Sequence, residues 1–320
     1  NIIGGSSQGS ANIIARNEPS GIFLENAHYN VIEGNYLGVD MNGVLTAKNQ
    51  HGIQFNNTSK NNLIKNNFIE GSRREGIELK GQYNQVLNNL IEYNGLSENY
   101  DGIYIQGEHN SIYGNVIKNS GRDGIHLSQS SNNAIGGQSP DQVNLISSNS
   151  HHGVGIVSSN SNTIENNLIG TNADQEPVLG NGHDGIEFFG DNNYQNLIQN
   201  NVIGGNTRSG IELWKENSCD GSQMNSFISN KIFDNGLFGI DIFHYGPNPN
   251  DEEDLDEGCN ELLNFPVINS ATFNGSNLEI KFNLDVPAGN YRVEFFGNPL
   301  PDPSLYGEGK FYLFSENITV

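Results

Sequence analysis

The chain has 320 residues, of which 34% are hydrophobic and 39 are glycine. A single globular domain of this length would have a thin core at that apolar content, so we expect repeats that pack on their neighbours. The 15 Lys and Arg against 37 Asp and Glu give a net charge of −22, which argues against nucleic acid as a partner and is compatible with calcium. No run of about 18 apolar residues occurs, so we expect no transmembrane segment.

An eight-residue pattern recurs from residues 30–37 to residues 225–232. Each copy has an Asn, an apolar residue two positions later, a second Asn five positions later and an apolar residue seven positions later. Asn tolerates left-handed turns and its amide both donates and accepts hydrogen bonds, so we expect a column of Asn side chains along stacked coils. The second Asn of the full copies is Asn35, Asn67, Asn89, Asn115, Asn167, Asn201 and Asn230.

A second pattern, Gly-Ile-x-apolar, falls between successive copies of the first. Its two apolar residues are two positions apart, so in a strand both point inward while x points outward. Several short strands every 22 to 32 residues, without helical periodicity, predict stacked β coils. The outward positions are Phe23, Gln54, Glu78, Tyr104, His126, Gly155, Glu187, Glu212 and Asp241.

The two patterns resemble those of the right-handed parallel β-helix family, which includes carbohydrate-binding proteins, polysaccharide lyases, glycoside hydrolases and alginate-epimerase-like enzymes. Residues 35–40 and 167–172 also look like repeats of large secreted bacterial surface proteins. The resemblance covers residues 1–245 and implies an all-β fold, a right-handed parallel β-helix of about nine coils. The matching residues occupy core and turn positions, so they say little about activity.

Insertions interrupt the coils at residues 39–50, 136–143, 171–184 and 215–223, and such loops often carry binding residues. Beyond the repeats, residues 246–264 read as an acidic loop or linker. Residues 265–320 read as a small antiparallel β-sandwich-like module, which at this size we expect to be incomplete or packed on the end of the rod.

The loop and the cysteines suggest two stabilising devices. Carboxylates in the acidic run offer hard oxygen ligands, so calcium is the cofactor we consider there, and no organic cofactor is expected. Cys219 and Cys259 lie in polar loops, and an oxidising compartment would let them form a disulfide; two unpaired thiols are the alternative. The calcium candidates are Asp251, Asp254, Asp256 and Glu257.

The outward column supplies the catalytic candidates. Tyr104 and His126 lie above Glu187 and Glu212, with Gly155 between the two pairs. A base and an acid astride a sugar ring, or a close carboxylate pair, would suit polysaccharide chemistry. The alternative is that these are ordinary solvent-facing residues of a sheet.

Two further groups of residues point to binding. Phe189, Trp214 and Phe243 follow the strands of adjacent coils and could form an aromatic shelf for sugar rings, or Trp214 could pack under an insertion or the end module. The His151-His152 pair could ligate a metal, but the sequence shows no evident partner at metal-site spacing.

The sequence carries no phosphate-binding loop, zinc signature or nucleophile elbow. We therefore expect a secreted or cell-surface β-helix protein, extracellular in either case, with a binding, adhesive or structural role, as one segment of a longer surface polypeptide. Its partners would be a polysaccharide or another surface glycan, or neighbouring copies or segments of the same protein. The alternative is a polysaccharide-active enzyme, a lyase, epimerase or glycoside hydrolase acting on the long face of the β-helix.

Overall fold

The computed structural model describes residues 1–40, 42–44, 47–214, 222–242 and 246–320. Cys219 and Phe243 lie outside these ranges, so the predicted disulfide and the third member of the aromatic shelf stay predictions. Within the described residues, no helix is long and apolar enough to cross a membrane.

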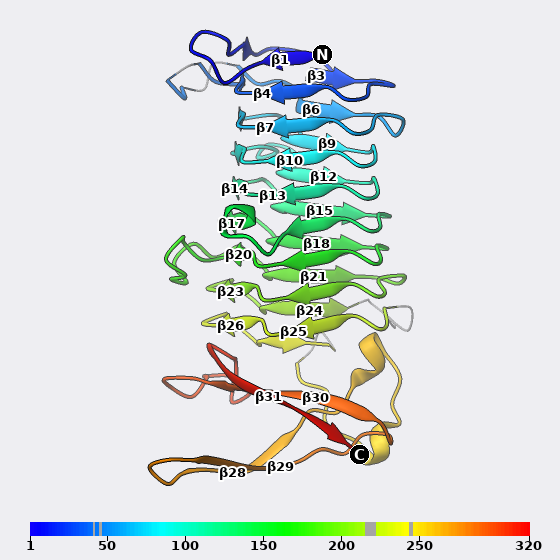
Figure 1. Ribbon diagram of the computed structural model, residues 1–320, viewed down its shortest axis with the longest axis vertical. Helices are drawn as coiled ribbons and strands as arrows, with labels where there is room; N and C mark the ends of the chain where they lie inside the picture. The colour runs from blue at the N-terminus through cyan, green and yellow to red at the C-terminus, as the bar shows by residue number, and fades with distance from the viewer. Residues whose placement is uncertain (41, 45–46, 215–221, 243–245) are drawn as a thin grey trace.

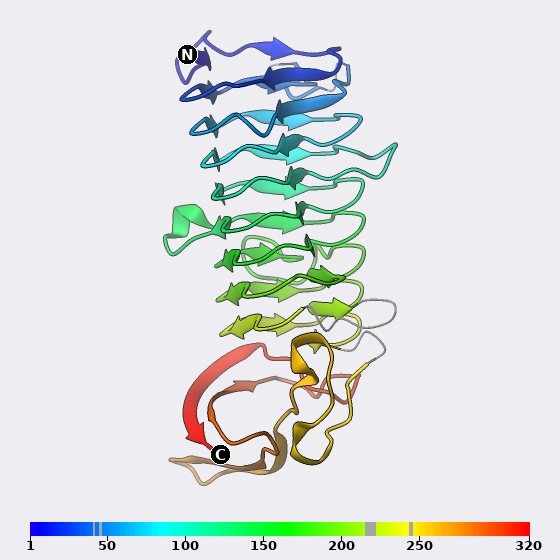
Figure 2. The same cartoon turned by 90° about the vertical axis from the view of Figure 1, so that its right-hand side faces the viewer.

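The repeats form a parallel β-helix of nine coils, drawn as a rod in Figures 1 and 2. Each coil gives one strand to each of three sheets, and every sheet has nine parallel strands in register. This confirms the predicted fold.

The strands of each sheet are short because each turn of the coil is tight. Sheet A contains β1 (Ile2–Gly4), β4 (Val31–Glu33), β7 (Leu63–Lys65), β10 (Gln85–Leu87), β13 (Ser111–Tyr113), β16 (Ala134–Gly136), β19 (Thr163–Glu165), β22 (Leu197–Gln199) and β25 (Ser226–Ile228). Sheet B contains β2 (Ile13–Ile14), β5 (Tyr36–Leu37), β8 (Phe68–Glu70), β11 (Leu90–Glu92), β14 (Val116–Lys118), β17 (Leu145–Ser147), β20 (Leu168–Ile169), β23 (Val202–Gly204) and β26 (Lys231–Phe233). Sheet C contains β3 (Ser20–Leu24), β6 (His51–Phe55), β9 (Ile77–Leu79), β12 (Ile103–Ile105), β15 (Ile125–Ser128), β18 (Val154–Val157), β21 (Ile186–Phe189), β24 (Ile211–Trp214) and β27 (Ile240–Asp241).

The core is one continuous column of aliphatic side chains. The strands of sheets A and B each supply one inward residue per coil, such as Ile64 and Ile69, and most strands of sheet C supply two, such as Ile53 and Phe55. The predicted inward residue Ile240 departs from this rule and is 45% exposed. Its strand belongs to the last coil, so no further coil covers it.

Buried asparagine ladders hold the coils in register. The amide nitrogen of Asn62 donates to Asn84 Oδ1 at 3.0 Å and to the backbone oxygen of Ala27, while the backbone N–H of Asn62 donates to the same Asn84 oxygen. The second Asn of the eight-residue pattern forms such a ladder, as predicted, and the first Asn forms another. A third ladder, not expected from the sequence, precedes sheet C and is interrupted by serines. Its bonds link Asn17 to Asn49, and then Asn149, Asn181, Asn206 and Asn235 in one run. Ser72 and Ser120 occupy this position in two coils and donate their backbone N–H groups to Asn94 and Asn149.

A small antiparallel module follows the rod, as expected, and Figures 1 and 2 show it below the last coil. It has two two-stranded sheets. Three short 3-10 helices occur in the loops that the structure describes. The predicted domain boundaries stay a prediction. The module strands are β28 (Val267–Phe273) with β29 (Leu278–Asn283), and β30 (Asn290–Gly297) with β31 (Phe311–Thr319). The 3-10 helices are η1 (Pro140–Gln142), η2 (Glu252–Asp254) and η3 (Cys259–Leu262).

The residues after the rod cap two of the ladders. Glu308 accepts hydrogen bonds from the backbone and side-chain amides of Asn235, and Asn260 accepts one from the backbone of Asn225 at 2.8 Å. Each replaces the Asn that a tenth coil would supply. Burial raises the pKa of Glu308 to about 7, against the opposing effect of the Asn235 hydrogen bonds.

This raised pKa predicts a pH-dependent cap. Between pH 4.5 and about 7 the folded chain holds a proton on Glu308 that the unfolded chain has lost, so this stabilisation is complete below pH 4.5 and disappears as pH rises through 7. The free energy of unfolding of the wild type should therefore fall between pH 5 and pH 8.5. We expect this fall to be smaller by on the order of 2 kcal/mol in Glu308→Gln, which keeps an acceptor oxygen. Thermal melts of both proteins at the two pH values measure the difference.

The exposed Glu316 on β31 gives the control, because Glu316→Gln should leave the pH dependence as in the wild type. Equal losses of stability in the wild type and in Glu308→Gln between the two pH values would contradict the prediction.

Candidate functional site

Polar residues gather along the edge of sheet C where its strands begin. Equivalent positions of successive coils stack there. For example, the backbone N–H of His183 donates to the carbonyl of His151, and that of Arg208 donates to the carbonyl of His183. The position two before the strand glycine holds Arg74, Tyr100, Arg122, His151, His183 and Arg208. The position directly before that glycine holds His51, Glu75, Asp101, Asp123, His152, Asp184 and Ser209, and the outward column of the strands lies beside both.

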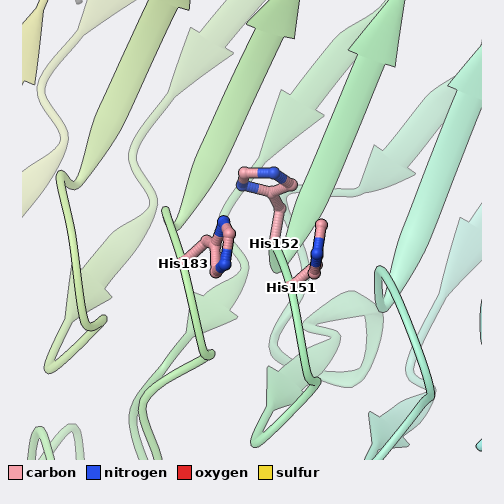
Figure 3. Close-up of side chains that lie close together, drawn as sticks. All are labelled: His151, His152 and His183. Atoms are coloured by element: carbon pink, nitrogen blue, oxygen red, sulfur yellow. The ribbon is translucent and has the colours of Figure 1, made fainter. Parts of the chain in front are cut away.

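Three histidines meet at the middle of this edge, and we call them the histidine cluster. His151 and His152 precede β18 and His183 precedes β21, one coil further on. The rings of His151 and His183 stack with centroids 4.2 Å apart, and His152 stands edge-on to both, as Figure 3 shows. One ring nitrogen from each lies within 4.8 Å of the others. The partner that the His151-His152 pair lacked in the sequence is therefore His183.

The two outer histidines of the cluster are suited to bind a cation. His151 is exposed and His183 is half-buried. Burial lowers the pKa of both, and for His183 the neighbouring imidazoles lower it further. Both rings are therefore neutral at neutral pH, which is the form that donates a lone pair to a metal ion.

The central histidine is held between two carboxylates. His152 Nδ1 lies 3.2 Å from Asp184 Oδ2, and Nε2 lies 3.1 Å from Glu187 Oε2. Burial alone would lower the pKa of His152, but the hydrogen bond to Asp184 and the charge of Glu187 outweigh it and raise the pKa. Asp184 also accepts the backbone N–H of Ser209 at 2.8 Å. A carboxylate on one ring nitrogen is how proteins commonly orient a metal-binding histidine.

A protonated acid lies next to this group. Burial and the charge of Asp184 raise the pKa of Glu212 to about 9, and Arg208 donates to it at 3.1 Å. Glu212, predicted from its outward position to be a catalytic candidate, has 0% exposure. Like charges stacked on neighbouring strands repel. Here that repulsion is offset by the raised pKa of Glu212 and by Arg208 of the same coil.

The Asp123–His126 pair lies on the other side of Gly155, and we call it the acid–base dyad. His126 Nδ1 is 2.8 Å from Asp123 Oδ2, and that hydrogen bond, acting against burial, lowers the pKa of Asp123 to about 2. Tyr104 stacks on His126 with ring centroids 5.6 Å apart, so these two predicted residues do lie together. A Cβ atom at Gly155 would come within 2.6 Å of Asp123 Oδ2, so glycine is required beside the dyad.

A metal ion fits the dyad poorly. Ligand atoms of Asp101, Asp123 and His126 lie within 4.8 Å of one another. Arg122, however, contacts both oxygens of Asp101 at 2.8 and 2.7 Å, and an ion would have to displace that guanidinium. Burial and the charge of Asp123 raise the pKa of Asp101 to about 6.

The aromatic shelf is attached to the histidine cluster. Phe189 and Trp214 make an edge contact with ring centroids 5.0 Å apart, and Phe189 is 37% exposed. Trp214 Nε1 donates to Glu187 Oε1 at 2.7 Å. Glu187, a second catalytic candidate, is therefore held by Trp214 on one oxygen and by His152 on the other.

The acidic loop gathers three of its four predicted calcium ligands. Asp251, Asp254 and Asp256 bring oxygens within 4.8 Å of one another, and Glu257 is not among them. The loop's own groups use some of these oxygens: Asp251 accepts the backbone N–H of Leu255, and Asp254 that of Asn264. Calcium in this loop stays a prediction.

We expect Gly155→Ala to destabilise the protein by about 1–3 kcal/mol, because the added methyl group must push against the buried Asp123 carboxylate. Thermal or denaturant unfolding measures this loss. Gly307→Ala is the control, since a Cβ atom at Gly307 meets nothing within 4 Å. Equal stability of the two variants would show that the space beside the dyad is not restricted.

Similar folds occur among solved structures. The chain is 18% identical to the periplasmic alginate epimerase AlgG, with a TM-score of 0.44 over 69% of this chain and 47% of that one, so it spans about half the length of the epimerase. It is 12% identical to an alginate lyase from Paenibacillus sp. str. FPU-7, with a TM-score of 0.37 over 75% of this chain and 83% of the lyase. The likeness concerns the fold alone.

No curated protein sequence matches the chain significantly. A family model does match, over residues 5–190, and its description is periplasmic copper-binding protein (NosD). The match covers more than half of the chain and contains both the histidine cluster and the acid–base dyad. The chain therefore belongs to the NosD family of periplasmic copper-binding proteins.

Proposed function

We propose that this protein binds copper at His151, His152 and His183. The observation that carries the proposal is the convergence of three imidazoles from two adjacent coils, with ligand nitrogens within 4.8 Å, inside the region that matches the copper-binding family. Imidazole is a good ligand for copper, and Cu(II) binds nitrogen sites more tightly than the other divalent first-row metals do.

The surroundings of the cluster support a cation. His151 and His183 are neutral at neutral pH, and Asp184 orients His152 from the opposite side of its ring. A bound copper ion would supply positive charge beside Asp184 and Glu187, together with a redox-active centre on the side of the rod. The protein's own residues hold, orient and partly shield that ion.

The family description favours an exported protein. We propose that it acts outside the cytoplasm, in the periplasm or at the cell surface. A β-helix with a net charge of −22 suits either place, since charge of one sign keeps a protein soluble. Adhesion, and a glycan or a second copy of the chain as partner, remain proposals of the same kind.

Removing one imidazole should weaken copper binding strongly. We expect His183→Ala to lower the affinity for Cu(II) by at least ~100-fold, and Asp184→Asn by ~10–100-fold, the range typical of an outer-shell partner. Calorimetric titration with glycine as a competing chelator measures both. His109→Ala is the control, because His109 is an exposed turn histidine stacked on Tyr83, outside the cluster.

A wild-type protein that cannot take copper from glycine would overturn the proposal. The same holds if His109→Ala loses as much affinity as His183→Ala, because binding would then be a general property of surface histidines.

The acid–base dyad favours a second function, proton transfer on a carbohydrate. Asp123 fixes His126 through Nδ1, so Nε2 is the nitrogen that could exchange a proton with a substrate, and Tyr104 lies against the same ring. This arrangement suits a lyase or an epimerase better than a glycoside hydrolase, whose second carboxylate would have to come from Glu187 or the buried Glu212.

The second function predicts a product. We expect the wild type, incubated with an array of acidic and neutral polysaccharides, to give new unsaturated ends or inverted sugar configurations, measured by ultraviolet absorbance and NMR. His126→Ala and Asp123→Asn should lower the rate by ~10²–10⁴-fold, while His109→Ala should not. If the wild type binds a polysaccharide but forms no product from any of them, the proposed enzyme activity is wrong and only a binding role is left.

A further inference from the structure

We propose that Glu187 is a fourth ligand of the histidine site and makes that site selective for Cu(II) over Cu(I). The inference rests on the proposed function, copper binding at the histidine cluster, and names the oxidation state that the cluster takes and the residue that selects it.

The Glu187 carboxylate lies beside the central histidine of the cluster. Its Oε2 atom lies 3.1 Å from His152 Nε2. Two donor atoms that share one ion at about 2.0–2.2 Å are separated by about 3 Å. His152 also belongs to both groups of candidate ligands, one with His151 and His183 and one with Asp184 and Glu187. The carboxylate therefore borders the histidine site at His152, the one residue that the two groups share.

Trp214 holds this carboxylate in place. Its Nε1 donates to Glu187 Oε1 at 2.7 Å, which fixes one oxygen and leaves Oε2 beside His152. Trp214 lies on β24, directly paired with Phe189 of β21, and the two rings are in contact. The aromatic pair that the sequence suggested as a sugar shelf thus acts here as a support for Glu187. Trp214 is a positioning residue and does not itself bind the ion.

The chemistry of the donors sets the oxidation state. Thiolate and thioether ligands select Cu(I), whereas imidazole and carboxylate ligands suit divalent ions. Among the described residues, no cysteine joins the histidine cluster. The negative charges of Glu187 and Asp184 together match the charge of one divalent ion, and a monovalent ion would leave one of them uncompensated in a chain that already carries −22.

The simpler account is that Glu187 only pairs with a protonated His152. In that account copper displaces the carboxylate, so removing its charge would leave the affinity for either oxidation state unchanged or raise it. The ligand account predicts the opposite for Cu(II) and no change for Cu(I), so the two are separable by experiment.

The chain offers a built-in reporter, because Trp214 is its only tryptophan. Paramagnetic Cu(II) quenches indole fluorescence at short range, whereas Zn(II) does not. We expect titration of the full chain with Cu(II) to quench Trp214 at one equivalent, and electron paramagnetic resonance of the complex to show nitrogen and oxygen coordination.

The decisive comparison uses Glu187→Gln, which keeps the shape and removes the charge. It should weaken Cu(II) by ~10–100-fold and change the resonance spectrum, while Cu(I), measured anaerobically against a chromophoric chelator, changes by less than about threefold. Glu98→Gln, at an exposed carboxylate on another turn, is the control. Glu187→Asp, which keeps the charge and shortens the reach, should fall between the wild type and Glu187→Gln.

Trp214→Phe should shift the resonance parameters and weaken Cu(II) by a smaller factor, with an unchanged melting temperature. No copper binding by the wild type would defeat the proposed function itself. Wild-type binding with an unchanged Cu(II) affinity and spectrum in a folded Glu187→Gln would leave the proposed function standing and overturn Glu187 as a ligand.

Discussion

The buried asparagine ladders are the constraint on which the rest of the structure depends. Most ladder oxygens accept a backbone N–H and a side-chain N–H from the preceding coil, as Asn115 Oδ1 does for Asn89. A slip of one residue between coils would leave these buried groups unpaired, at a cost of about 1–3 kcal/mol each. The coils therefore stack in one register, and equivalent positions form columns whatever residues they hold.

The columns bring like charges close enough to repel, and they also bring side chains close enough to share a ligand. Strand spacing of about 4.8 Å brings side chains at equivalent positions close together, and like charges there repel. The chain offsets this with the Arg122–Asp101 pair and with a proton on Glu212. The same spacing brings the imidazoles of His151 and His183, one coil apart, into contact. Ladder asparagines thus say nothing about activity directly, but they decide which residues can share a ligand.

The repeat pattern was enough to predict the β-helix, its nine coils, the ladder at the second Asn of the eight-residue pattern and the contact between Tyr104 and His126. It was not enough to predict the histidine cluster, because His183 and Asp184 end an insertion and look like loop residues. Their equivalence to His151 and His152 becomes visible only when the glycine after Asp184 is aligned with the glycine after His152. Nor could strand alternation show that an outward acid such as Glu212 is buried, with Arg208 of the same coil hydrogen-bonded to it.

The two candidate functions are physically linked through one carboxylate. Asp123 Oδ2 holds His126, and Asp123 Oδ1 accepts the backbone N–H of His152 at 3.1 Å. A shift of the His152 turn would therefore move the group that orients the dyad. Because the backbone hydrogen bonds of successive coils fix that turn, the linkage acts through a rigid element with little freedom of its own. An ion at the histidine cluster and a substrate at the dyad would thus bind to one continuous polar edge.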